Sequence, residues 1–173
     1  MALSRTLIRT YAFVHDRHPH LALQAANRRI LEDTHSDLFV TVFYGVLDPA
    51  AGTFRYCNAG HNPPYLFTPD AETPQALTRT ALPLGLFDDQ PWEMAEVRLQ
   101  PGDLLLLYSD GIVEAEDEEQ AQFGEEYLQQ LGRYCRAKSA VFTQEKIVDA
   151  VYDFVGDAEQ SDDMTLMVLK RER

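Results

Sequence analysis

Hydrophobic residues recur at helical spacing near the start of the chain. Between Leu3 and Val14 the apolar positions fall three or four residues apart, which predicts a helix with one buried stripe. A second helix is expected over Leu21–Leu31, with Pro19 in its first turn, because the first turn leaves its amide hydrogens unbonded and proline has none. The pattern therefore predicts two amphipathic helices before any strand.

The pattern then changes to that of strands. Leu38–Leu47 is rich in β-branched and aromatic residues and predicts a strand, and Asp48–Gly52 has the composition of a hairpin loop. Thr53–Asn58 is expected to return as the antiparallel partner. Shorter strands are expected at Tyr65–Phe67 and over Trp92–Leu99.

An uninterrupted apolar run stands out from these alternating segments. Leu104–Tyr108 follows a Pro-Gly turn and leads into Ser109-Asp110-Gly111, which predicts a strand buried on both faces with Asp110 at its end. An Asp-Gly pair after a strand is typical of a simple turn. A carboxylate at the end of a core strand is also a rigid place to hold a hard cation.

The last third of the chain returns to helical spacing. One helix is expected from Glu125 to Arg136, with the apolar face Leu128, Leu131 and Tyr134-Cys135. Another is expected to be capped by Thr143 and to end at Gly156, before a final strand over Met164–Leu169. The order of helices and strands predicts an α+β fold with a mostly antiparallel sheet system.

Composition and charge narrow the class of protein. The 173 residues suffice for one domain with a sizeable core, and no apolar run approaches the roughly 18 residues of a membrane span. The net charge of −13 argues against nucleic acid and anionic membrane as partners. Much of it lies between Glu114 and Glu126, which predicts an exposed acidic segment leading into a helix. Cys57 and Cys135 are expected to be free core thiols of a cytoplasmic protein.

Two further segments carry candidate chemistry. Asp162-Asp163 stands where the final strand begins, and adjacent carboxylates repel each other unless something neutralises them. They are either solvated or meet Asp110 across the sheet and share a cation with it. His61, in a loop that two prolines and a glycine restrain, is either a proton carrier near a site or a residue that only braces the loop.

Five segments in this order resemble a known family. They resemble the SpoIIE/RsbU-type branch of the PPM metal-dependent serine/threonine phosphatases over essentially the whole chain. The segments are Phe39-Val40-Thr41 with Tyr44, Asn58–Pro64, Leu82–Leu86, Pro101–Ala115 and Ser161–Leu166.

The resemblance implies a fold and a chemistry. It implies a β-sandwich flanked by helices in αββα layers, with two Mn²⁺ or Mg²⁺ ions that activate a water molecule to attack a phosphoserine or phosphothreonine ester. By motif position, Asp110 and Asp162 match metal ligands and Asp163 is the neighbour; no catalytic residue beyond the metal ligands is expected. Gly111, Asn58 and His61 are possible site-lining residues.

The resemblance also implies partners. Family members usually act on phosphorylated anti-anti-sigma (STAS-domain) proteins in a partner-switching cascade that controls a sigma factor. An upstream sensory domain is expected in the parent chain.

The sequence departs from the family at its beginning. Two strands with a Gly-Asp-aromatic-aromatic-Asp motif and an Asp-x-Ser-Gly-His/Lys-Gly motif have no counterpart, so we expect residues 1–173 to be one N-terminally truncated phosphatase domain. Its metal shell is then incomplete, and the chain alone is expected to be inactive or nearly so. Unpaired sheet edges would favour a homodimer. The alternative is a non-catalytic PPM-fold module that binds a regulatory partner.

Overall fold

The computed structural model describes residues 2–33, 39–160 and 162–172. The chain forms two compact units. The first unit comprises Met1–His61 and Thr78–Arg98, and the second comprises Asn62–Leu77 and Leu99–Arg173.

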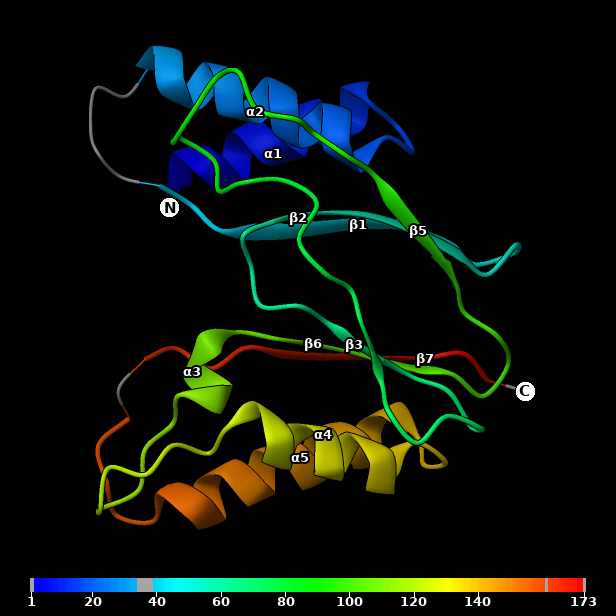
Figure 1. The fold of residues 1–173 in the computed structure, drawn as a ribbon, viewed down its shortest axis with the longest axis vertical. Coiled ribbons are helices and arrows are strands. Elements are labelled where there is room, and N and C mark those ends of the chain that lie inside the picture. The colour runs from blue at the N-terminus through cyan, green and yellow to red at the C-terminus, as the bar shows by residue number, and fades with distance from the viewer. Residues whose placement is uncertain (1, 34–38, 161, 173) are drawn as a thin grey trace. The chain divides into compact units, whose positions relative to one another are not determined.

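The first unit consists of two helices and an antiparallel sheet. Its helices are α1 (Ala2–Val14) and α2 (Pro19–Asp33), and both predicted helices are thereby confirmed, with proline opening the second. Figure 1 shows them over one face of the sheet, whose strand order is β1-β2-β5. The strands are β1 (Val42–Asp48), β2 (Thr53–Ala59) and β5 (Ala95–Arg98). Buried apolar side chains from the helix α2, the strand β2 and the 81–84 turn form its core: Leu23, Ile30, Cys57, Ala59, Ala81 and Leu84.

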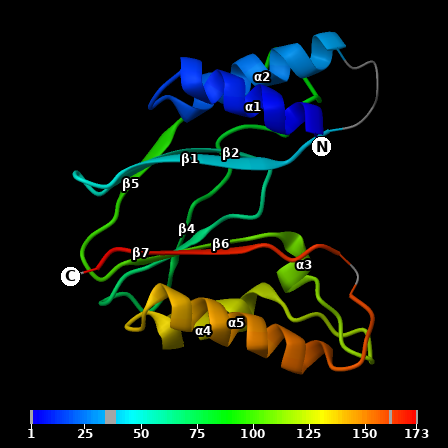
Figure 2. The same ribbon diagram turned by 180° about the vertical axis from the view of Figure 1, so that it is seen from behind.

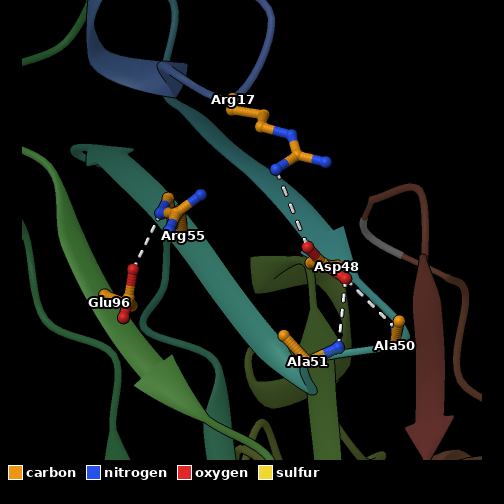
Figure 3. Close-up of polar contacts among 6 residues, drawn as sticks. All are labelled: Arg17, Asp48, Ala50, Ala51, Arg55 and Glu96. Carbon is orange, nitrogen blue, oxygen red and sulfur yellow. Dashed lines mark hydrogen bonds and ion pairs between the residues drawn. The ribbon is translucent and has the colours of Figure 1, made fainter.

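The predicted hairpin between β1 and β2 is confirmed. The strands pair antiparallel from Val42↔Ala59 to Asp48↔Thr53. Asp48 builds the turn, since its Oδ1 accepts from the backbone N–H groups of Ala50 at 3.2 Å and Ala51 at 3.1 Å (Figure 3). The hydrogen bond from Ala51 lowers the pKa of Asp48, and Arg17, 3.8 Å away, acts in the same direction.

Two predicted strand boundaries in this unit were wrong. The first strand was expected from Leu38, which lies outside the described residues, but β1 begins at Val42. Val40 instead exchanges two backbone hydrogen bonds with Leu84, both 2.9 Å long. The strand expected from Trp92 begins only at Ala95, where pairing with β2 starts. Tertiary pairing, and not local composition, therefore sets both ends.

The second unit places two long helices on one face of an antiparallel sheet. Figure 2 shows α4 (Glu125–Cys135) and α5 (Ala140–Val155) lying side by side along the sheet, whose strand order is β4-β3-β6-β7. The strands are β3 (Tyr65–Phe67), β4 (Gln75–Ala76), β6 (Leu104–Tyr108) and β7 (Leu166–Lys170). With both units composed of helices on antiparallel sheets, the predicted α+β class is confirmed.

The strand β6 is the centre of this sheet. It pairs with β3 on one side and β7 on the other, and Leu104, Leu105 and Leu106 are fully buried. The prediction of a strand buried on both faces is confirmed. At 3.3 Å per residue, β6 carries the chain about 16 Å through the core before it ends beside Asp110.

Two details of the helices differ from expectation. Ser139, not Thr143, caps α5: its Oγ accepts from the backbone N–H of Phe142 at 3.2 Å, whereas Thr143 is buried one turn inside and donates to the Ser139 carbonyl. Tyr134 was expected on the apolar face of α4 but is 62% exposed. The buried face repeats at Leu128, Leu131 and Cys135, and Tyr134 lies about 100° from Cys135 around the helix.

Both cysteines are buried and free, as predicted. None of the helices among the described residues combines the length and apolarity that a membrane span requires.

Candidate functional site

The end of β6 delivers Asp110 to the surface of the second unit. Ser109 leaves the strand in extended conformation, and the four-residue helix α3 (Asp110–Val113) begins immediately after it. Ile112 and Val113 are buried, whereas Asp110 is exposed. The sequence predicted the position of Asp110 at the strand end but not the helical turn that follows.

Gly111 fits against the Asp162-Asp163 segment with no room for a side chain. A Cβ at this position would lie 2.6 Å from the carbonyl oxygen of Asp163 and 3.4 Å from the carbonyl carbon of Asp162. Real Cβ atoms essentially never make the first of these contacts, so only glycine is tolerated without movement. The two acidic motifs, about fifty residues apart in sequence, are therefore adjacent in space.

Hydrogen bonds of Ser109 also join the end of β6 to the segment that follows Asp162. Its backbone N–H donates to the carbonyl of Thr165 at 3.0 Å, and its hydroxyl donates to the carbonyl of Asp163 at 3.1 Å. That hydroxyl also accepts from the backbone N–H of Thr165 at 2.9 Å. These bonds extend the β6–β7 pairing beyond its last ladder pair, Tyr108↔Leu166.

The backbone segments that carry Asp110, Asp162 and Asp163 are in contact, but the three residues are exposed to solvent. Asp110 accepts from the backbone N–H of Gly111 at 3.0 Å, and Asp162 accepts from that of Asp163 at 2.7 Å. Carboxylate oxygens are the ligands that Mg²⁺ and Mn²⁺ prefer, so the donor set suits a hard cation. Yet no three His, Cys, Asp or Glu side chains of the described residues are grouped so that they could hold a metal ion. The predicted ligands therefore lie near one another where β6 ends and before β7 begins, but their carboxylates do not point toward a common centre.

Asn58 and His61 belong to the first unit. Asn58 is fully buried. Its side-chain oxygen accepts a hydrogen bond from the backbone N–H of His61 at 2.9 Å, and its backbone N–H donates to Thr80 Oγ1 at 3.0 Å. Gly60 has a φ of +79°, and a Cβ there would lie 2.6 Å from Pro83 Cγ. Asn58 therefore fixes the shape of its loop, and the site-lining role of either residue stays a prediction.

A contact between the carboxylate of Glu125, which is exposed, and two buried tyrosines was not predicted. Glu125 accepts from the hydroxyl of Tyr65 at 2.8 Å and from that of Tyr108 at 3.3 Å, which ties the first residue of α4 to β3 and β6. Burial raises the pKa of Tyr108, and hydrogen bonding to Tyr65 acts in the same direction. The only signal in the sequence was a glutamate in the first turn of an expected helix, where its negative charge interacts favourably with the positive end of the helix dipole. Its partners could not be read from that signal.

Comparisons with known proteins show which family the chain belongs to. The family model described as Stage II sporulation protein E (SpoIIE) matches residues 1–172. The phosphoserine phosphatase RsbU of Bacillus subtilis (strain 168) is 29% identical over 157 residues, covering 89% of this chain and 45% of RsbU. The phosphoserine phosphatase RsbP of the same organism is 32% identical over 99 residues, covering 57% of this chain and 23% of RsbP.

A solved structure shows the same fold. The SiaA-PP2C domain of Pseudomonas aeruginosa superimposes with a TM-score of 0.84 at 21% identity, covering 98% of this chain and 68% of that domain. This likeness confirms the predicted PPM phosphatase fold. The chain spans less than half the length of the curated relatives that it matches. From the match of the family model over residues 1–172, the chain belongs to the SpoIIE family, the branch of the PPM phosphatases that its motifs resembled.

Proposed function

We propose that this chain carries the Asp110 and Asp162-Asp163 part of the metal centre of a PPM-type serine/threonine phosphoprotein phosphatase. The observation that supports the proposal most is the contact at Gly111, because it leaves space for no side chain between the two acidic motifs. Such close backbone packing is expected if the carboxylates of both motifs must bind the same ion. We also propose that residues 1–173 act as one SpoIIE-type domain, since one family model spans both units.

In this proposal Asp110 and Asp162 hold a Mn²⁺ or Mg²⁺ ion, with Asp163 beside them. Bound divalent ions supply an activated water for hydrolysis of a phosphate ester. Ser109 and Gly111 position the two acidic segments through the backbone contacts described above. The catalytic domain of the phosphatase PstP, which has the same fold with a TM-score of 0.63, has been solved with two manganese ions, which supports this choice of metal.

The substrate we propose is a phosphorylated anti-anti-sigma (STAS-domain) protein. The support is similarity to proteins named phosphoserine phosphatase RsbU and RsbP. A solved chain that holds RsbU and RsbW domains of Mycobacterium tuberculosis also aligns, at 26% identity and a TM-score of 0.76. The net charge of −13 argues against a nucleic-acid substrate, because nucleic-acid binding proteins usually present a basic surface to the phosphates.

We further propose that residues 1–173 by themselves are inactive, or nearly so, as a phosphatase. Two ions need more oxygen ligands than three carboxylates supply, and those three do not converge in the described part of the chain. In this proposal, the active enzyme binds its ions with further ligands besides these three carboxylates.

The proposal is tested by replacing Asp110 with Asn in the intact protein. We expect kcat/KM for release of phosphate from a phosphorylated STAS-domain protein to fall on the order of 100-fold, because a lost metal ligand removes the activated water. Asp149→Asn is the matched control, since Asp149 is exposed on α5 and the same charge is removed there. Equal activity of Asp110→Asn and the control would contradict the proposal. Absence of activity and of manganese binding in the unaltered protein would favour a non-catalytic binding module.

A further inference from the structure

A groove lies beside the proposed metal centre in the second unit. It consists of two hollows of about 330 Å³ and 190 Å³, both lined by Tyr152 of α5 and by Met164 before β7, and we call them together the α5 groove. Ile112 lines the larger hollow, and Gly111, where the two acidic motifs are in contact, lines the smaller one. The groove therefore begins one residue along the chain from each acidic motif.

The larger hollow of the α5 groove is mostly apolar. Six of its eight lining residues are aliphatic, aromatic or methionine side chains. Ile112 and Val151 are almost completely buried, whereas Tyr152 is 58% exposed. A hollow with this lining favours an apolar side chain, because its binding removes apolar surface of both partners from water.

The position of the groove relative to the acidic motifs is fixed by Ser109. Met164 lies between Asp163, whose carbonyl accepts from the Ser109 hydroxyl at 3.1 Å, and Thr165, whose backbone N–H donates to the same hydroxyl at 2.9 Å. The side chain of Met164 also packs against the core of the second unit. Figure 1 shows α3 and the segment that leads into β7 at the same end of the sheet. The bonds that bring the acidic motifs together therefore also set this wall of the groove.

The charged side chains that line the groove are both carboxylates. Glu116 and Glu159 line the smaller hollow, and no basic residue of the described part of the chain lines either hollow. The ion pairs found among the described residues include neither glutamate. A partner with a Lys or Arg at this point is favoured by charge complementarity. A second copy of this chain, with a net charge of −13, is a poor occupant for the same reason.

We propose that the α5 groove binds the phosphoprotein substrate through an apolar side chain near its phosphorylated residue, with a neighbouring Lys or Arg facing Glu116 and Glu159. The inference rests on the proposed phosphatase function, because a substrate held at the metal centre extends over the surface where the groove begins. Three residues of extended chain span about 10 Å. The apolar residue is therefore expected within about three residues of the phosphorylated one.

A peptide titration followed by amide NMR, without divalent metal, tests the groove independently of catalysis. Each peptide carries a central phosphoserine, with a Leu-Arg pair placed in turn at each position within three residues of it. A matched peptide carries Gly-Gln at the same place. We expect the best Leu-Arg peptide to bind residues 1–173 about tenfold more tightly than its match, because its leucine leaves water. The amide signals of Tyr152 and Met164 should shift most.

Two variants with matched controls locate the binding. Tyr152→Ala should weaken the best Leu-Arg peptide about tenfold. Tyr134→Ala is its control, since Tyr134 is similarly exposed but lies on α4 outside the groove lining, and it should leave the affinity within twofold. Glu159→Gln should weaken binding about two- to fivefold, as for an exposed ion pair. Glu126→Gln, which removes an exposed carboxylate of α4, is the control for that charge.

Phosphate release by the intact protein separates this inference from the proposed function. A preference in kcat/KM for the Leu-Arg peptide that Tyr152→Ala removes would support both. Phosphate release without that preference would overturn the inference alone, and binding at the groove without any release would support the groove and overturn the function.

Three further results would overturn the inference. They are equal binding of the Leu-Arg and Gly-Gln peptides, equal weakening by Tyr152→Ala and Tyr134→Ala, and self-association of the chain that Tyr152→Ala abolishes, which would assign the groove to a second copy. The peptide pair keeps the test decisive even if Tyr152→Ala impairs folding, because only the peptide changes.

Discussion

Gly111 shows how a single residue decides the geometry of the candidate metal centre. From sequence, Asp110-Gly111 had two interpretations, a simple turn or part of a site. The absence of a side chain at Gly111 allows the backbone of Asp163 to approach, and this approach brings the acidic motifs together. Local propensity could not reveal this requirement, because the atoms that impose it come from a segment about fifty residues later.

The expected effect of Gly111→Ala follows from that contact. The new Cβ would lie 2.6 Å from a backbone oxygen, which cannot rotate away, so the 162–163 segment must move. We expect the free energy of unfolding to fall by about 1–3 kcal/mol, as for overpacking in a core. Urea unfolding measures this loss, and amide NMR signals should shift most at Asp162, Asp163 and Thr165. Unchanged stability with unchanged signals at these residues would show that the contact is looser than described.

At the scale of elements, local patterns predicted which segments are helices and strands, but not where they end. The helices α1, α2 and α4 and the strands β2 and β3 begin and end within about two residues of their predictions. The start of β1 and the cap of α5 differ because tertiary contacts decide them: Val40 pairs with Leu84, and Thr143 is drawn into the core of the second unit.

The cap of α5 gives a prediction at this scale. Ser139→Ala removes the acceptor for the Phe142 N–H and should lower the free energy of unfolding by about 1 kcal/mol. Ser139→Asp retains a side-chain acceptor and a favourable charge at the helix start, so it should restore most of the loss. Thermal unfolding of both variants measures the difference. Equal loss in the two variants would mean that the hydroxyl contributes something other than a cap.

For the whole molecule, the sequence predicted the class of fold, the family and the order of the acidic motifs along the chain. It did not predict the Glu125 contact with Tyr65 and Tyr108. This contact depends on residues distant in sequence that only the folded sheet brings together, and it belongs to no motif with fixed spacing. The homodimer expected from unpaired sheet edges stays a prediction.

The central claim is that Asp110 and the Asp162-Asp163 segment bind the same metal ion. A titration with Mn²⁺, followed by the amide NMR signals of the protein, tests this claim most directly. Paramagnetic Mn²⁺ should broaden the signals of Gly111 and Asp163 first. Asp110→Asn should abolish this selectivity, whereas Asp149→Asn should preserve it. Uniform broadening across the acidic surface, or selective broadening that persists in Asp110→Asn, would contradict the claim.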